Sequence, residues 1–138
     1  RDFENIVAIK EASGNIGQMD EIIKNKPEGF DVISGDDGIT FPLITLGAVG
    51  VISVLGNAFP AEFSKMNRLA LEGNYAEALT IHHQFTEIIN LLFADGNPAG
   101  AKAMLNIMGM CENKLRLPLV PAREATCDKL RAAWEALK

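Results

Sequence analysis

Three short apolar runs, each followed by a helical pattern, constrain the fold of this chain more than any other feature. The runs occupy residues 6–9, 30–33 and 51–54, and they recur at intervals of about twenty to twenty-five residues, the spacing of βα units. Continuous apolar runs of this kind are typical of strands buried on both faces. Each crossover helix returns the chain to the same end of the sheet, so the strands are predicted to be parallel. The sequence therefore predicts an α/β fold.

Turn and cap residues set the ends of the intervening helices. Helical spacing of apolar residues predicts helices over residues 16–26, 37–46 and 60–72. Asp36 or Asp37 is well placed to cap the second helix, and Gly47 to end it. Pro60 occupies the first-turn position that proline favours.

After Gly73 the apolar runs stop and only helical patterns follow. Three helices are predicted, over residues 75–93, 98–108 and 123–137. The chain is therefore expected to have two parts: the βα units in residues 1–74, and a helical extension in residues 75–138.

Three parallel strands make a poor domain by themselves. Both sheet edges would present unpaired backbone groups, and strands this apolar require helices on both faces or closure into a barrel. A complete (β/α)8 barrel needs around 250 residues, whereas this chain has 138. We therefore expect the C-terminal part of a (β/α)8 TIM barrel, three βα units followed by a three-helix extension, in a chain whose first strands are missing.

Composition excludes several functional classes. The net charge of -5 argues against nucleic-acid binding. Cys111 and Cys127 form no C-x-x-C pair and no signal peptide is visible, which favours a cytoplasmic location. Residues 38–61 carry no charge, but Gly and Pro interrupt them, so a buried helix and strand are favoured over a membrane span. His82 and His83 are predicted to be surface residues, and no metal site or cofactor is indicated.

Lys10 is the strongest candidate for chemistry. It directly follows the first apolar run, and parallel barrels place their active sites at the C-terminal ends of their strands. An apolar strand beside a lysine reduces hydration of the ammonium and favours the free amine, which can attack a ketone and form a Schiff base. The alternative is a lysine that reaches solvent or pairs with Glu11.

Several segments resemble the dihydrodipicolinate synthase family, the pyruvate-dependent class I aldolase type, and they follow in the family's order. They are Ile9-Lys10-Glu11-Ala12-Ser13-Gly14, Ser34-Gly35-Asp36-Asp37, Gly50-Val51-Ile52-Ser53-Val54, Gly96-Asn97-Pro98 with Lys102, and Leu115-Arg116-Leu117-Pro118. The resemblance extends from Asn5 to the C-terminus.

The resemblance implies specific roles for three residues. Lys10 would form the imine with pyruvate, the backbone carbonyl of Ile52 would line the pyruvate site, and the missing side chain of Gly35 would leave room for substrate. Asp36 and Asp37 are expected to cap the next helix and set the loop rather than act as an acid–base pair. Lys102 is expected to serve structure.

The implied reaction condenses pyruvate with aspartate semialdehyde to 4-hydroxy-tetrahydrodipicolinate, the entry to lysine and diaminopimelate synthesis. The family's proton relay uses two tyrosines and a threonine from earlier strands, and an arginine binds the semialdehyde carboxylate. None of these positions exists here, and Tyr75 is the only tyrosine. We therefore expect the parent protein to be an active homo-oligomer, a dimer or tetramer, and the isolated chain to be inactive or nearly so.

Two alternatives stay open. The parent could be a related pyruvate aldolase or lyase that takes sialic acid or keto-sugar acids. The chain could instead be a non-catalytic half-barrel module, whose sheet edges pair with a partner.

Overall fold

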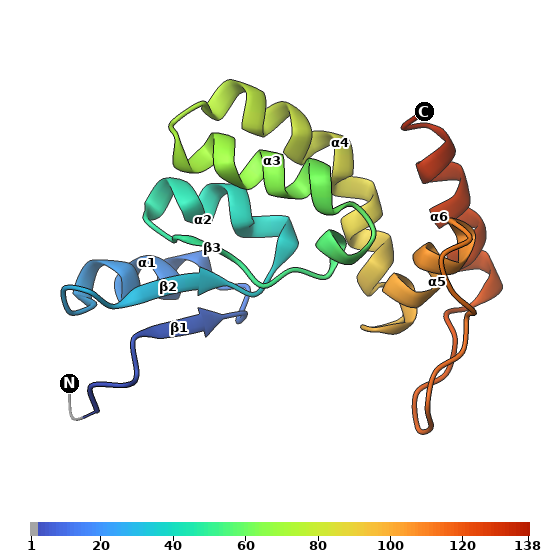
Figure 1. Ribbon diagram of the computed structural model, residues 1–138, viewed down its shortest axis with the longest axis horizontal. Helices are drawn as coiled ribbons and strands as arrows, with labels where there is room; N and C mark the ends of the chain where they lie inside the picture. Colours follow the sequence, from blue (N-terminus) through green and yellow to red (C-terminus); the bar gives the residue numbers. More distant parts are fainter. Residues whose placement is uncertain (1–2) are drawn as a thin grey trace.

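The computed structural model describes residues 3–138 as a small parallel sheet with helices beside it and beyond its end (Figure 1). The three βα units are formed, in chain order, by β1 (Ala8–Glu11), α1 (Ile16–Asn25), β2 (Asp31–Ser34), the 3-10 turn η1 (Asp37–Ile39), α2 (Thr40–Leu46), β3 (Gly50–Val51), the 3-10 turn η2 (Leu55–Asn57) and α3 (Pro60–Leu71). Three helices follow: α4 (Tyr75–Phe93), α5 (Ala99–Ile107) and α6 (Glu124–Glu135).

The sheet has the predicted parallel topology. Its strand order is β1-β2-β3, with Ala8 opposite Asp31 and Ile33 opposite Gly50. All three strands therefore point toward the same end of the molecule, the end at which α5 and α6 lie (Figure 1). The α/β class and the sequence of three βα units are confirmed.

The first strand differs from the prediction in position and in burial. It covers Ala8–Glu11, so Lys10 lies within the strand rather than after it. Ile6 and Val7 precede the strand and are 57 % and 59 % exposed. The prediction of a run buried on both faces is wrong for these residues, because β1 is an edge strand with no neighbour on its free side among the described residues.

The third strand is shorter than expected because a buried carboxylate draws the chain out of the sheet. Strand pairing of β3 covers only Gly50 and Val51. The Asp37 side chain accepts hydrogen bonds from the backbone N–H groups of Val54 (3.0 Å) and Leu55 (2.8 Å), which turns the chain into η2.

Gly47 and Pro60 mark helix ends as predicted, whereas α2 begins at Thr40 rather than at residue 37. The Asn15 side chain accepts a hydrogen bond from the N–H of Gln18 and caps α1. Gly47 ends α2 with a φ of 116°, a backbone conformation that residues with a side chain rarely adopt. Pro60 starts α3, as predicted.

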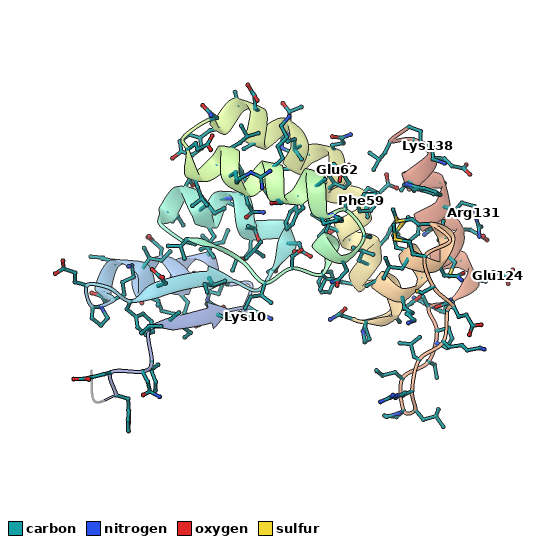
Figure 2. The ribbon with its side chains drawn as sticks, viewed as in Figure 1. Lys10, Phe59, Glu62, Glu124, Arg131 and Lys138 are labelled. Carbon is teal, nitrogen blue, oxygen red and sulfur yellow. The ribbon has the colours of Figure 1, made fainter. Side chains whose placement is uncertain are left out.

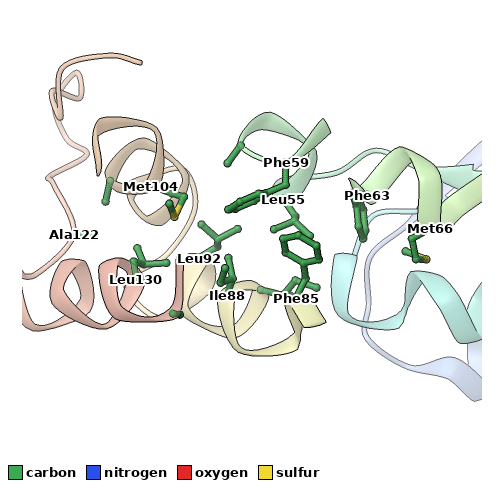
Figure 3. Packing of buried hydrophobic residues seen from close by; sticks show 14 of the residues in the cluster. Leu55, Phe59, Phe63, Met66, Phe85, Ile88, Leu92, Met104, Ala122 and Leu130 are labelled. Carbon is green, nitrogen blue, oxygen red and sulfur yellow. The ribbon is translucent and has the colours of Figure 1, made fainter. Parts of the chain in front are cut away.

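One hydrophobic cluster joins the third βα unit to the C-terminal helices. Phe59 and Phe85 pack with ring centroids 4.9 Å apart, and Ile88 and Leu92 of α4 contact the same cluster (Figure 3). Met104 of α5 and Leu130 of α6 extend it. Because the cluster spans both sides of residue 74, the helical extension is anchored on the βα part. The division at residue 74 stays a prediction.

The end of α4 is fixed to α5 and α6 by two close contacts. A Cβ on Gly100 would lie 2.1 Å from the backbone oxygen of Leu92, so α5 approaches α4 at a distance that only glycine permits. Asp95 accepts hydrogen bonds from the Arg123 backbone N–H (2.9 Å) and Nε (2.6 Å) just before α6.

Among residues 3–138, none of the helices has the length and apolar character needed to cross a membrane.

Candidate active site

The sequence-predicted site residues come together around one cavity of about 460 Å³. Its sheet side is lined by Lys10, Gly35, Ile52, Ser53, Val54 and Asn57. Figure 2 shows Lys10 near the tip of β1, with its side chain directed toward the part of the molecule that contains α5. The cavity therefore lies at the C-terminal ends of the parallel strands, as expected for a site of this fold class.

Lys10 does not pair with Glu11. The two Glu11 carboxylate oxygens accept hydrogen bonds from the Ser13 N–H and the Gln18 Nε2, each at 2.8 Å. These hydrogen bonds lower the pKa of Glu11 below its usual value. The bond from the Ser13 backbone has the largest effect, and the bond from Gln18 has the next largest. Neighbouring side chains of a strand point to opposite faces, so Glu11 faces α1 and Lys10 faces the cavity. The alternative of a Lys10–Glu11 pair is wrong.

Lys10 is exposed in the structure. The desolvation that the sequence predicted from its strand is not supplied by the described residues, because β1 has a free edge. The alternative of a lysine that reaches solvent agrees with this exposure.

Gly35 makes room for Lys10 itself. A Cβ at residue 35 would lie 2.7 Å from the Lys10 Cε and 2.7 Å from the Ala12 Cβ. These distances are too short for carbon atoms, so any side chain at residue 35 would displace the lysine. The glycine therefore allows the Lys10 side chain to lie across the end of β2. The sequence predicted instead that the missing side chain leaves room for substrate.

The loop after β2 is held by a compact hydrogen-bond network. The Thr40 hydroxyl donates to the Ser34 Oγ (2.9 Å) or to the backbone oxygen of Asp36 (2.7 Å). Asp36 accepts a hydrogen bond from the Gly38 N–H at 2.9 Å, which caps η1. Asp37 is buried and binds the segment after β3. Both aspartates hold backbone in the structure, in agreement with the predicted loop role. The prediction that one of them caps the helix is wrong, because the Asp36 cap falls on η1, and α2 has Ile39 at its N-cap position with no side-chain cap.

Ile52 lies where β3 leaves the sheet. Its N–H donates to the Ser34 backbone oxygen at 2.9 Å, which keeps the segment aligned beside β2. Its side chain is exposed, and the residue lines the same cavity as Lys10 and Gly35.

The helical side of the cavity was not predicted from the sequence. It is lined by Phe93, Asn97, Pro98, Ala101, Lys102 and Leu105, from the end of α4 through the first two turns of α5. Lys102, expected to serve structure alone, therefore borders the candidate site. The available signal was the Gly96-Asn97-Pro98 segment with Lys102, which the resemblance already included.

The two histidines differ in environment. His83 is exposed, as predicted, but His82 is half-buried with its ring centroid 5.7 Å from that of Phe41. Burial is the main cause that lowers the pKa of His82, and the charge of the neighbouring His83 lowers it further. The prediction that His82 is a surface residue is wrong because Phe41 of α2 covers it. Within residues 3–138 we find no group of three or more His, Cys, Asp or Glu side chains suited to hold a metal ion.

Comparison with known proteins gives one consistent family. The model of the dihydrodipicolinate synthetase family matches residues 1–137. A 4-hydroxy-tetrahydrodipicolinate synthase from Phocaeicola vulgatus is 76 % identical over 138 residues, which is 100 % of this chain and 46 % of the relative. The chain thus spans about half the length of the curated relatives it matches.

Solved structures agree with the sequence relatives. The dihydrodipicolinate synthase of Thermotoga maritima superposes with a TM-score of 0.94 at 39 % identity, and the match covers 99 % of this chain and 47 % of that structure. The enzyme from Acinetobacter baumannii, described as chloride-inhibited and complexed with pyruvate, gives a TM-score of 0.92 at 34 % identity, covering 96 % and 46 %. The three βα units and the helical extension therefore correspond to the C-terminal part of a (β/α)8 barrel.

Proposed function

Because the chain belongs to the dihydrodipicolinate synthetase family, we propose that it supplies the Schiff-base lysine of a 4-hydroxy-tetrahydrodipicolinate synthase. The substrates in this proposal are pyruvate and aspartate semialdehyde. The main support is that Lys10, Gly35 and Ile52, three residues singled out from separate segments of the sequence, line a single cavity. The description of the Acinetobacter baumannii relative as complexed with pyruvate supports the choice of the ketone substrate.

The proposed reaction starts at the Lys10 amine. Its neutral Nζ attacks the pyruvate carbonyl carbon, and loss of water leaves a protonated imine. The imine withdraws electrons, so a proton leaves the methyl carbon and an enamine forms. The enamine carbon then attacks the aldehyde carbon of the second substrate, whose oxygen takes up a proton. Finally the amine of that substrate adds to the imine carbon and displaces Lys10 as the ring closes.

Gly35 and Ile52 have positioning roles in this proposal. Gly35 lets the Lys10 side chain lie across the end of β2, since a Cβ there would meet the Lys10 Cε. Ile52 would present its backbone carbonyl to pyruvate, at the point where its N–H is already held by Ser34. Neither residue supplies a proton, so turnover depends on other groups.

We further propose that these 138 residues alone turn over little or no substrate. Each proton transfer requires a positioned acid or base, and the resemblance assigns this relay to tyrosines and a threonine outside this chain. Tyr75, its only tyrosine, begins α4 and does not line the cavity. A cytoplasmic, homo-oligomeric parent protein is part of the same proposal.

Trapping of the imine tests the nucleophile directly. The chain is incubated with pyruvate and borohydride, which reduces an imine to a stable secondary amine, and the modified residue is located by peptide mass spectrometry. We expect one modified residue, Lys10, and loss of the adduct in Lys10→Met. Lys24→Met removes an exposed lysine on α1, outside the cavity, and should leave the adduct unchanged. An adduct spread evenly over the lysines would contradict the assignment.

A second candidate function is supported by the open sheet edge. Ile6 and Val7, just before β1, and Ile9 within it expose apolar side chains, a surface suited to pairing with another polypeptide. A non-catalytic assembly module would therefore form a stable dimer or larger species on size-exclusion chromatography and would show no Lys10 adduct. A compact monomer that forms the adduct would exclude it.

A further inference from the structure

Glu11 directly follows the proposed nucleophile, and the proposed function assigns it no role. Its side chain is 9 % exposed, and Asp37 is the only other acidic residue that is buried among residues 3–138. A buried carboxylate is stable only where hydrogen bonds replace the water it has lost. The partners of Glu11 therefore show which parts of the fold this side chain holds together.

The Glu11 carboxylate joins the end of β1 to the start of α1. One oxygen accepts a hydrogen bond from the Ser13 N–H and the other from the Gln18 Nε2, each at 2.8 Å. Ser13 lies in the turn between the two elements, and Gln18 lies in the first turn of α1. Hydrogen bonds to an ionised acceptor are stronger than those between neutral groups. The two bonds therefore hold the Glu11 side chain on the α1 side of the sheet.

The backbone of Glu11 is held from the opposite direction. Its carbonyl oxygen accepts a hydrogen bond from the Gly35 N–H at 2.8 Å. Gly35 is also the residue whose missing Cβ leaves space for the Lys10 Cε. Glu11 is thus bonded both to α1 and to the glycine against which the Lys10 side chain lies.

The end of β1 depends on these bonds because β1 is an edge strand. Within the described residues it pairs with β2 alone. The Lys10 side chain is exposed, so its direction depends on the backbone that carries it. Successive side chains of a strand point to opposite faces. When the Glu11 side chain is bonded to α1, the Lys10 side chain is directed to the cavity.

We propose that Glu11 is a positioning residue for the Lys10 amine and acts through its bonds to Ser13 and Gln18 rather than through its charge. This inference rests on the proposed function, in which Lys10 is the nucleophile. Addition to a carbonyl requires a close, aligned approach, so a lysine on a released strand end forms the imine more slowly. Pyruvate binding should change less, since Glu11 does not line the cavity.

Three substitutions separate the bonds of Glu11 from its charge. Glu11→Gln removes the charge and keeps both bonds, because its amide oxygen accepts from Ser13 and its amide nitrogen donates to the rotated side-chain amide of Gln18. Glu11→Ala removes the charge and both bonds. Gln18→Met removes one bond and keeps the charge. Gln84→Met is the matched control, since Gln84 is exposed on α4 and lies outside the cavity.

The first measurement follows the position of Lys10 without pyruvate. The Lys10 Cε lies 2.7 Å from the place of a Cβ on Gly35, so protons of the two residues should give a nuclear Overhauser effect in a 13C-labelled chain. We expect this effect to persist in Glu11→Gln and Gln84→Met. It should be lost in Glu11→Ala and weakened about twofold in Gln18→Met, which keeps one bond. An unchanged effect in Gln18→Met would overturn the inference, also where Glu11→Ala does not fold.

The second measurement is the rate of imine trapping at Lys10. The limiting rate at saturating pyruvate should fall about tenfold in Glu11→Ala and about threefold in Gln18→Met, while the pyruvate concentration for half-maximal trapping changes less than about twofold. Both quantities should be unchanged in Glu11→Gln and Gln84→Met. A loss in Glu11→Gln as large as that in Glu11→Ala would assign the effect to charge and overturn the inference.

Failure of the proposed function gives a different result. In that case the unchanged chain shows no trapping at Lys10. The expected pattern of Overhauser effects in the same proteins would still establish that Glu11 sets the position of the Lys10 side chain.

Discussion

The segment that leads into the edge strand β1 and the buried face of α4 show the two extremes of packing in this molecule. Ile6 and Val7 are more than half exposed, whereas Phe85 and Leu92 are 2 % and 0 % exposed. Both segments were read from the sequence as buried apolar patterns. Helix α4 finds its partners within the chain, in α3, α5 and α6, but β1 has a paired neighbour on one side only. An apolar pattern therefore identifies an element that can be buried, and its burial depends on which segments are present beside it.

This contrast places the candidate site at the boundary between the two regions. The nucleophile proposed here is on the exposed edge strand, while the opposite wall of the cavity comes from the ends of α4 and α5. The helical wall is packed into the main hydrophobic cluster, and the strand wall is open on one side. We therefore expect changes in the helical core to affect folding most, and changes near the strand ends to affect the site.

Truncation of a core side chain should give the largest effect on stability. Phe85→Ala removes a ring packed against Phe59 and should lower the free energy of unfolding by about 3–5 kcal/mol. The matched change on the free edge, Ile9→Ala, should lower it by less than about 1 kcal/mol, because Ile9 is already exposed. Chemical denaturation measures both. Equal losses for the two variants would contradict the comparison.

Removal of the buried Asp37 carboxylate should give the next largest effect. Asp37→Ala leaves the N–H groups of Val54 and Leu55 without their partner, and each such group costs about 1–3 kcal/mol. We expect a loss of about 2–3 kcal/mol in denaturation, together with weaker imine trapping, because the segment after Ile52 is released. Asp36→Ala, which removes a single cap bond to Gly38, is the control and should cost less. A larger loss in the control would show that Asp37 does not hold this segment.

A methyl group at residue 35 should reduce imine trapping at the site more than it reduces the stability of the fold. Gly35→Ala forces both Lys10 and Ala12 to move, at a cost of about 1–2 kcal/mol in stability. Trapping of pyruvate at Lys10 should fall much more steeply than stability, because the lysine is the displaced group. Gly50→Ala, where a Cβ meets nothing within 4 Å, serves as the control on β3. Unchanged trapping in Gly35→Ala would show that Lys10 does not need this position.

The smallest expected effect is confined to acid pH. Hydrogen bonds lower the pKa of Asp95 from 3.8 to about 2, and the bond from the Arg123 side chain has a larger effect than the bond from Thr126. A carboxyl whose pKa is depressed by folding stabilises the folded state above its unfolded pKa, and this contribution is lost as the pH falls from about 4 to about 2. Asp95→Asn should therefore flatten the decline of stability in that window. A thermal-unfolding series from pH 2 to pH 6 measures it, and parallel profiles for the two proteins would exclude this role.

Much of the fold could be predicted because its signals are local. The left-handed Gly47 and the first-turn Pro60 act within a few residues, and both were found where expected. The errors came from contacts distant in sequence. Asp37 shortens β3 through bonds to residues seventeen and eighteen positions away, and Phe41 covers His82 from another helix. Neither contact leaves a periodic signal.

The site could be predicted in part. Lys10 was identified because it follows an apolar run, at the strand end where parallel barrels place their active sites, and the resemblance supplied its Schiff-base role together with Gly35 and Ile52. Lys102 was placed on the correct helix but given no role at the site, since sequence spacing alone does not show that α5 and the strand ends line the same cavity. The contact between Gly35 and Lys10 leaves no signal in the sequence either, because Lys10 is in β1 and Gly35 follows β2.

Reconstitution of the complete site provides the most direct test of Lys10 as its nucleophile. The chain is mixed with a polypeptide comprising the part of the Phocaeicola vulgatus relative that it does not match, and condensation of pyruvate with aspartate semialdehyde is measured. We expect trace turnover from the chain alone, turnover in the mixture, and a loss of at least about a hundredfold when the chain carries Lys10→Met. A Lys10→Met mixture as active as the unchanged one would contradict the assignment.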